Sequence, residues 1–301
     1  MNFERSFVLY YMLYYNYTIE IRKEDSMKEQ LEAFRQYLKK EERAGATIEK
    51  YARDVRCFLQ FLDGHEPSKE DVLAYKEYLC QQYAPTSVNA ALSSLNGFFK
   101  FLGRQDLKVK NLKIQKNIFS SEEKELSKNE YERLVESAIR TKNERLSLVL
   151  QTICSTGIRV SELSYITVSA IGRGIADIDC KGKRRRIFLP SRLCKILRIY
   201  VNKKKIKRGP VFVTKNGRPL DRSNIWAEMK KLCIIAGVPE GKVFPHNLRH
   251  LFARTYYKIQ KDIVKLADIL GHTNINTTRI YTMESGEAHR RQIEKLGFLR
   301  C

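Results

Sequence analysis

The sequence predicts a mostly α-helical protein with a small antiparallel β-sheet, divided into two domains. Three observations lead to this prediction. Apolar residues recur at helical spacing from Met27 onward, whereas residues 173–189 alternate as strands do, and residues 113–126 keep no steady period. A length of 301 residues also suits two domains of roughly 150 residues each.

The first domain is expected over residues 27–112 as a unit of four helices. Thr47 and Ser68 are the expected N-caps of its second and third helices, because hydroxyl side chains accept a hydrogen bond from the first helical turn. Pro85 suits the first turn of the fourth helix, where its missing N–H costs nothing. Residues 1–26 precede this pattern and are expected to form an N-terminal extension outside the fold.

The second domain is expected over residues 127–301, after a linker at 113–126. Ser127 and Glu130 have the spacing of a capping box, which predicts that a helix begins there. The domain is expected to be mixed α+β and to end in a C-terminal tail.

Two segments of the second domain have strand signals. The turn Lys181-Gly182-Lys183 divides the alternating stretch 173–189 into a predicted hairpin. Val211-Phe212-Val213, followed by the Asn216-Gly217 turn, predicts another small strand unit.

The charge balance favours a polyanionic partner. Fifty-six Lys and Arg against 34 Asp and Glu give a formal net charge of +22, in a chain with 43% hydrophobic residues that is typical of a folded protein. Basic runs at 181–186 and 203–208 favour contacts with phosphates, although each run alone is also typical of a solvated surface.

Composition argues against membrane and disulfide proteins. No apolar run reaches the ~18 residues that a membrane-spanning helix needs, so no membrane partner is expected. The seven cysteines are odd in number, scattered and without a C-x-x-C pair, which argues against a zinc knuckle or redox motif. The expected compartment is a reducing cytoplasm.

Two candidate cations come from the first half of the second domain. Gly157 lets a helix end in a left-handed turn, and Arg159 projects from that turn. Lys181, on the hairpin turn, could reach a ligand and donate a proton if other cations lower its pKa, and Lys183 competes for this role. An ordinary salt bridge is the alternative for Arg159 taken alone.

A third stretch begins with a proline and continues as a helix. Its first turn holds His246, and Arg249 follows one turn later on the same face. His246 and His250 have the spacing of a zinc-protease helix, but that motif needs a glutamate after its first histidine, and here the residue is Asn247. No metal site is therefore expected.

The last stretch follows a helical stripe that ends at Gly271. His272 leaves this helix end, and Tyr281 follows nine residues later. A tyrosine oxygen is a nucleophile only with a base and a cationic site beside it, because its resting pKa is near 10.

In their order and spacing, these stretches resemble the tyrosine recombinase (phage integrase) family, and most closely its short Xer-type members. The resemblance covers about residues 27–301. It implies an N-terminal helical core-binding domain that contacts DNA and a tyrosine recombinase catalytic domain. The catalytic residues that it implies are Arg159, Lys181, His246, Arg249, His272 and Tyr281.

The activity implied by the resemblance is site-specific recombination through a 3′-phosphotyrosyl intermediate, without ATP, metal or any other cofactor. The implied partners are double-stranded DNA and three further copies of the chain, in a tetramer on two DNA sites. A second recombinase or an accessory DNA-bending protein is a further expected partner. The resolution of chromosome dimers, the integration or excision of DNA elements, and the inversion of DNA segments all use this chemistry.

Two other functions stay open. A type IB topoisomerase-like enzyme would share the tyrosine chemistry but relax supercoils without exchanging partners. A non-catalytic DNA-binding regulator would fit the helix-turn-helix resemblance of residues 264–281, but it would not need Arg159, His246, Arg249 and Tyr281 together.

Overall fold

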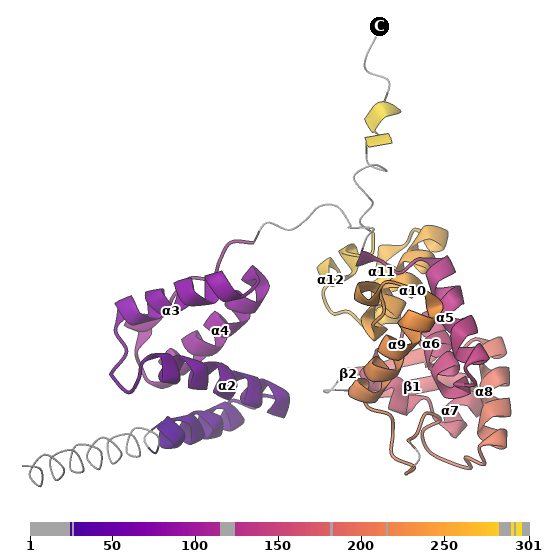
Figure 1. Cartoon of the computed structure of the whole chain (residues 1–301), viewed down its shortest axis with the longest axis horizontal. Helices are drawn as coiled ribbons and strands as arrows, with labels where there is room; N and C mark the ends of the chain where they lie inside the picture. Colours follow the sequence, from indigo (N-terminus) through magenta and orange to yellow (C-terminus); the bar gives the residue numbers. More distant parts are fainter. Residues whose placement is uncertain are drawn as a thin grey trace, which may run out of the picture. The chain divides into compact units, whose positions relative to one another are not determined.

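The computed structural model describes residue 25 and residues 27–114, 124–180, 183–214, 216–282, 290–291 and 293–296. The chain forms two compact units, Met1–Lys116 and Asn117–Cys301, each of which is described by itself (Figure 1). The predicted domain limits of 27–112, 113–126 and 127–301 stay predictions. Most of the predicted extension, residues 1–24, lies outside the described residues.

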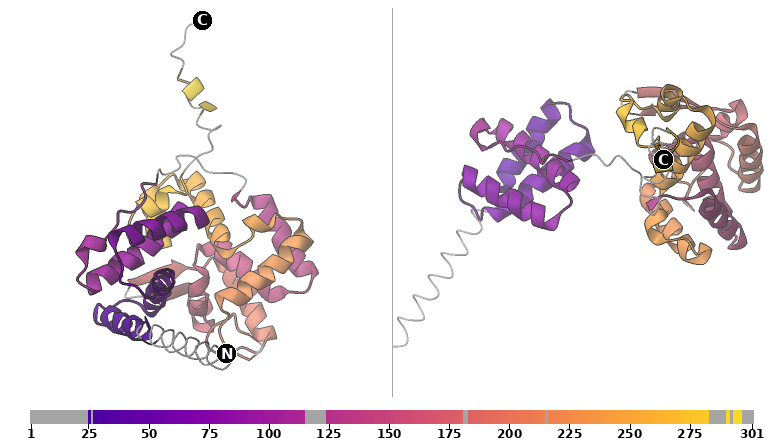
Figure 2. Two further views of the ribbon diagram at one scale, coloured as in Figure 1. Left: turned by 60° about the vertical axis from the view of Figure 1, so that its left-hand side comes forward. Right: turned by 90° about the horizontal axis from the view of Figure 1, so that it is seen from above.

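The first unit is helical (Figure 2). Its elements are a helix over residues 27–40, α2 (Gly45–Phe61), α3 (Lys69–Gln82), α4 (Pro85–Phe101) and the short 3-10 helix η1 (Gln105–Leu107). Phe34, Phe58, Phe98 and Phe99 are fully buried at its centre. The rings of Phe34 and Phe98 meet edge to face at 5.2 Å, a geometry that aromatic pairs prefer.

A partly buried polar contact also joins α2 to α4. The Lys50 ammonium donates to Asp54 Oδ2 at 2.6 Å, and the Ser94 hydroxyl donates to the same oxygen at 2.7 Å. This pairing satisfies polar groups that would otherwise destabilise the core.

Two of the three expected helix starts in this unit are confirmed. Ser68 caps α3 in a capping box, and Pro85 is the first residue of α4. The expected N-cap Thr47 is wrong: α2 begins at Gly45, and its N-cap Ala44 makes no side-chain hydrogen bond. The Thr47 N–H donates to the Ala44 carbonyl at 2.8 Å, which places Thr47 inside the first turn.

The second unit combines helices with one hairpin. Its first half contains α5 (Lys128–Arg140), α6 (Glu144–Thr156), η3 (Val160–Tyr165), α7 (Val168–Arg173), β1 (Ile175–Cys180), β2 (Lys183–Phe188) and α8 (Ser191–Lys203). Its second half contains α9 (Arg222–Ala236), η4 (Glu240–Lys242), α10 (Pro245–Gln260), α11 (Ile263–Leu270) and α12 (Asn276–Arg279). The expected fold class, mostly helical with a small antiparallel sheet, is confirmed.

Helix α6 lies at the centre of this unit. It packs against α5, α8, α9 and α10, and most of its residues are buried. The capping box of Ser127 and Glu130 begins α5 as expected. This central packing fixes the C-terminal end of α6, from which one of the candidate functional residues projects.

The hairpin places alternate side chains on opposite faces. β1 and β2 pair antiparallel with Ile178 opposite Arg185 and Ala176 opposite Ile187. Because side chains alternate along a strand, Arg185 shares the inward face with the buried Ile187, whereas Arg184 and Arg186 point outward.

The strand unit expected at Val211–Val213 is reduced, among the described residues, to a single antiparallel bridge across the predicted turn, and no longer strand forms there. Only isolated bridges form, Thr167 with Pro210 and Val213 with Pro219. Hydrogen bonds flank the second bridge, because the Thr214 N–H donates to the Arg218 carbonyl at 2.7 Å and the Leu220 N–H donates to the Phe212 carbonyl at 3.1 Å. Among the described helices, none is long and apolar enough to cross a membrane.

Candidate functional site

The first part of the site is the turn after α6. Gly157 adopts φ +65°, and a Cβ there would lie 2.4 Å from Cδ1 of Phe252 on α10. Only glycine suits both the left-handed conformation and the close approach. The chain then turns through the buried Ile158 to Arg159, the N-cap of η3.

Glu162 holds Arg159 in place. Its carboxylate accepts hydrogen bonds from the Arg159 backbone N–H at 2.9 Å and from Arg159 Nη1 at 3.0 Å. The Glu162 side chain is only 4% exposed, against 39% for Arg159. Burial alone would raise the pKa of Glu162, but the Arg159 N–H and the charge of Arg185 hold it below its ordinary value. Arg159 is thus oriented and still open to a ligand.

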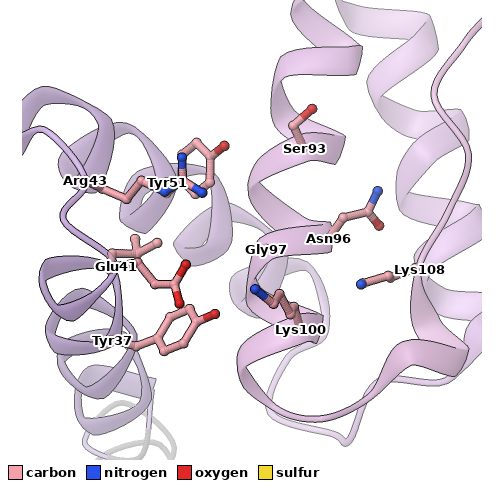
Figure 3. Close-up of a pocket in the computed structure, with 10 residues that line it drawn as sticks. Tyr37, Glu41, Arg43, Tyr51, Ser93, Asn96, Gly97, Lys100 and Lys108 are labelled. Atoms are coloured by element: carbon pink, nitrogen blue, oxygen red, sulfur yellow. The ribbon is translucent and has the colours of Figure 1, made fainter.

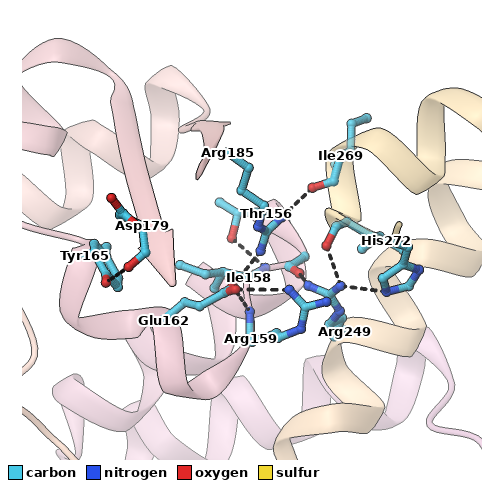
Figure 4. Close-up of polar contacts among 12 residues, drawn as sticks. Thr156, Ile158, Arg159, Glu162, Tyr165, Asp179, Arg185, Arg249, Ile269 and His272 are labelled. Carbon is cyan, nitrogen blue, oxygen red and sulfur yellow. Dashed lines mark hydrogen bonds and ion pairs between the residues drawn. The ribbon is translucent and has the colours of Figure 1, made fainter. Parts of the chain in front are cut away.

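Arg249 on α10 is almost completely buried, at 1% exposed. Its Nη1 donates to the Gly157 carbonyl at 2.5 Å, and its Nη2 donates to the Leu270 carbonyl at 2.8 Å (Figure 4). These carbonyls belong to the ends of α6 and α11, where backbone acceptors lack partners within the helix. Burial and then Arg159 lower the pKa of Arg249 to about 10, so it stays charged at neutral pH.

His272 connects Arg249 to the segment after α11. Its Nε2 lies 3.0 Å from Arg249 Nη2 and its Nδ1 lies 2.9 Å from Thr278 Oγ1. Arg249 can only donate, so Nε2 accepts and the neutral ring carries its proton on Nδ1. Burial and the charges of Arg249 and Arg159 lower the pKa of His272 to about 4. The imidazole is therefore neutral near pH 7.

The Tyr281 ring packs against the rings of His250 and His272. It is 4.8 Å from that of His250 in an edge-to-face contact, and it lies 6.1 Å from that of His272, nearly parallel. Tyr281 is 3% exposed and belongs to a small core cluster with Leu266 and Leu270. The fold thus brings the candidate nucleophile to the end of α11.

His246 occupies the first turn of α10, as predicted. It is exposed, and its ring centroid lies 4.4 Å from that of His250 one turn later. Partial desolvation and then Arg249 and Arg159 lower its pKa, which keeps a neutral base available near pH 7. Burial and then the neighbouring His246 lower the pKa of His250 to about 4.

Five of the six predicted site residues therefore meet around the ends of α6 and α11. They are Arg159, His246, Arg249, His272 and Tyr281. The sixth, Lys181, lies outside the described residues. Among the described residues, no group of three or more His, Cys, Asp or Glu side chains has the arrangement of a metal site.

Sequence reasoning missed Glu162 and Thr278. Glu162 stands three residues after Arg159, a capping-box spacing that could have identified it. Nothing in the sequence singled out Thr278, because its contact with His272 depends on how the chain turns after α11.

The first unit has a pocket of about 390 Å³ between α2, α4 and the helix over residues 27–40 (Figure 3). Its lining includes the cations Arg43, Lys100 and Lys108, the ring of Tyr51, and one acidic side chain, Glu41. Three cations beside an aromatic ring suit an anionic ligand. The negative charge of Glu41 partly offsets their attraction for such a ligand.

Comparison with known proteins gives one consistent result. Residues 124–287 match the model of the Phage integrase family, and residues 31–106 match the Phage integrase N-terminal SAM-like domain. The first of these matches spans more than half of the chain.

Individual relatives match along most of their length. The chain is 29% identical to Tyrosine recombinase XerD of Oceanobacillus iheyensis over 258 residues, covering 78% of this chain and 86% of the relative. It is also 29% identical to Tyrosine recombinase XerA of Pyrococcus furiosus over 290 residues, covering 93% and 98%.

The solved structures that match this chain include recombinases as well. The crystal structure of XerA recombinase matches with a TM-score of 0.50 at 28% identity, over 91% of this chain and all of that one. XerH site-specific recombinase bound to its difH substrate shares the fold, with a TM-score of 0.64 at 20% identity over 80% of this chain and 78% of that one.

Proposed function

The chain belongs to the phage integrase family and is a tyrosine-type site-specific recombinase acting on DNA, and from this premise we propose which of its residues carry the reaction. The Tyr281 hydroxyl attacks the scissile phosphorus. A new bond forms between Tyr281 Oη and phosphorus while the bond from phosphorus to the 5′ oxygen breaks. The products are a 3′-phosphotyrosyl enzyme and a free 5′ hydroxyl.

Two proton transfers balance this step. His246 takes the proton of the Tyr281 hydroxyl, and its lowered pKa supports the role because the ring is neutral at physiological pH. Lys181 gives a proton to the departing 5′ oxygen. Its position in the chain, directly after β1, supports this assignment, with Lys183 as the competing donor.

The charge that develops on the non-bridging oxygens needs hydrogen-bond donors, and Arg159, Arg249 and His272 supply them. The observation that carries the proposal is the position of Arg249. Its guanidinium joins the turn before Arg159, the end of α11 and His272 in one hydrogen-bonded group. A guanidinium has five N–H groups, and these three contacts leave two for a phosphate.

His272 must change its hydrogen bonding to donate to the phosphate. Nε2 accepts from Arg249 in this structure, so a proton has to move to Nε2 when DNA binds. Thr278 allows this change, because its hydroxyl can accept from Nδ1–H or donate to bare Nδ1. We therefore assign Thr278 to the support of both forms of the ring.

The 5′ hydroxyl of a second duplex can attack the phosphotyrosyl bond, which preserves the energy of the phosphodiester. We propose that four copies perform this exchange on two DNA sites, with no added cofactor. The solved lambda integrase tetramer bound to a Holliday junction has the same fold and supports the idea. A second recombinase or an accessory DNA-bending protein is a further proposed partner.

We propose that the first unit contacts DNA as the core-binding domain, with the pocket beside α4 facing the sugar-phosphate backbone. The support is chemical: Arg43, Lys100 and Lys108 converge there. Phosphate contacts of this kind position a protein on DNA without reading its sequence.

A nicked suicide duplex tests the nucleophile. It should trap a covalent adduct, seen by denaturing electrophoresis, with the wild-type chain and with the control Tyr256→Phe. Tyr281→Phe should bind the duplex with unchanged affinity and form no adduct. An adduct that persists in Tyr281→Phe would remove this residue from its role.

A second assay separates recombination from DNA relaxation. Two duplexes with different labelled flanks are incubated with the protein, and the products are sized. A recombinase exchanges the flanks, whereas a topoisomerase-like enzyme reseals each duplex with its original partner.

A further inference from the structure

Arg185 differs from the other cations of the basic hairpin. Its side chain is 12% exposed, whereas those of Arg184 and Arg186 on the same strand are 87% and 62% exposed. The strand register explains the difference, because Arg185 faces inward opposite the buried Ile178. The basic run suggests a phosphate contact here, but both ends of the Arg185 guanidinium are already bound to protein acceptors.

The two ends of its guanidinium bind different parts of the site. Nη2 donates to Glu162 Oε2 at 2.5 Å, and Nη1 donates to the Ile269 carbonyl at 2.6 Å in the last turn of α11 (Figure 4). A Cβ on Gly271 would lie 2.4 Å from Arg185 Cδ, so the glycine before His272 also leaves room for this side chain.

Arg185 also determines how much of Glu162 is available to Arg159. Glu162 Oε1 accepts from Arg159 Nη1, while Oε2 accepts from Arg185 and from the Arg159 backbone. Without Arg185, the buried carboxylate would keep Arg159 as its only cationic partner among the contacts described. Arg185 thus joins the β1–β2 hairpin to the carboxylate that orients Arg159.

We propose that Arg185 is a positioning residue for the reaction, which fixes the β1–β2 hairpin against Glu162 and the end of α11. Lys181 directly follows β1 in the chain, so we assign to Arg185 the alignment of the proposed general acid with Arg159 and His272. The inference rests on the proposed function of Lys181 and extends it. Arg185 itself does not touch the substrate.

This role predicts a separation of DNA affinity from cleavage rate. Arg185→Gln should leave the DNA dissociation constant and its salt dependence unchanged, because the Arg185 guanidinium is bound to Glu162 and to the Ile269 carbonyl rather than to DNA. The rate of adduct formation at saturating DNA should fall about 10²-fold, the typical loss when a reacting group is misplaced by about 1 Å. Arg184→Gln, which removes an exposed charge from the same strand, should instead weaken binding and reduce the salt dependence.

A substrate with a 5′-thiol leaving group distinguishes positioning from loss of structure. A thiolate departs without a general acid, so this substrate should restore the rate of Arg185→Gln to within a few-fold of wild type, as it should for Lys181→Ala. Arg173→Gln, an exposed arginine that pairs with Asp177 on β1, is the control and should behave as wild type on both substrates.

Arg185→Lys keeps the charge beside Glu162 but cannot reach both acceptors, so it tests the idea if Arg185→Gln does not fold. It should melt near the wild-type temperature and cleave at least tenfold more slowly, with rescue by the thiol substrate. Equal defects on both substrates, or a wild-type rate in a folded variant, would overturn the inference. If wild type forms no adduct, the proposed function itself fails, and if Lys181→Ala is not rescued, the proposed role of Lys181 as general acid fails.

Discussion

Thr278→Val isolates the hydrogen bond that orients His272. The substitution keeps the shape of a side chain that is fully buried, but it removes the hydroxyl that lies 2.9 Å from His272 Nδ1. A partly buried ring N–H without its partner costs about 1–3 kcal/mol. At about 1.4 kcal/mol per tenfold change in rate, adduct formation should slow by about 5-fold to 150-fold.

The assay is single-turnover adduct formation on a nicked duplex at saturating DNA, with the dissociation constant measured separately. Thr278→Ser keeps the hydroxyl and should stay within a few-fold of wild type. Thr277→Val, at the exposed neighbour whose hydroxyl donates to the Asn274 carbonyl, should have no effect on the rate. A wild-type rate in Thr278→Val would refute the reasoning about His272.

Three further predictions follow from the charges of the two units. The melting temperature of the DNA-free protein should fall as the pH drops from 6.5 to about 4.5, because the unfolded chain protonates His250 and His272 there while the folded chain, with pKa values of about 4, does not. Calorimetry across this range checks it, and a flat profile contradicts it. Lys181→Ala should be rescued by a 5′-thiol leaving group; rescue of Lys183→Ala instead would reassign the acid. Lys100→Ala should lower the slope of log K against log salt by about 0.9 in a titration, and an unchanged slope would remove the pocket from the DNA interface.

Local signals accounted for most element boundaries. The caps at Ser68 and Ser127 and the proline at the start of α10 act within one helical turn, so the sequence alone contains their geometry. Gly157 and Gly271 end helices in the left-handed conformation for the same reason. These residues also position the site, because Arg159, His246 and His272 each stand next to such a boundary.

Two features that the sequence did not predict have other causes. Thr47 has the right chemistry for a cap, but the backbone begins the helix two residues earlier, where Ala44 is extended. Arg185 looks like an exposed cation until the register with β1 is known, and its acceptors are 23 and 84 residues away. Periodicity within a segment contains no information about such pairs.

The contacts of Arg249 and Arg185 explain how the cations are held together before DNA binds. Like charges at short range repel, and the lowered pKa of Arg249 reflects its burial and then the charge of Arg159. The carbonyls at the ends of α6 and α11, together with Glu162, offset this cost because they bear partial or full negative charge. Arg159 and Arg249 are then oriented before the substrate arrives, whereas His272 becomes a donor only after its proton moves to Nε2. Such a site stabilises the transition state more than the singly charged diester.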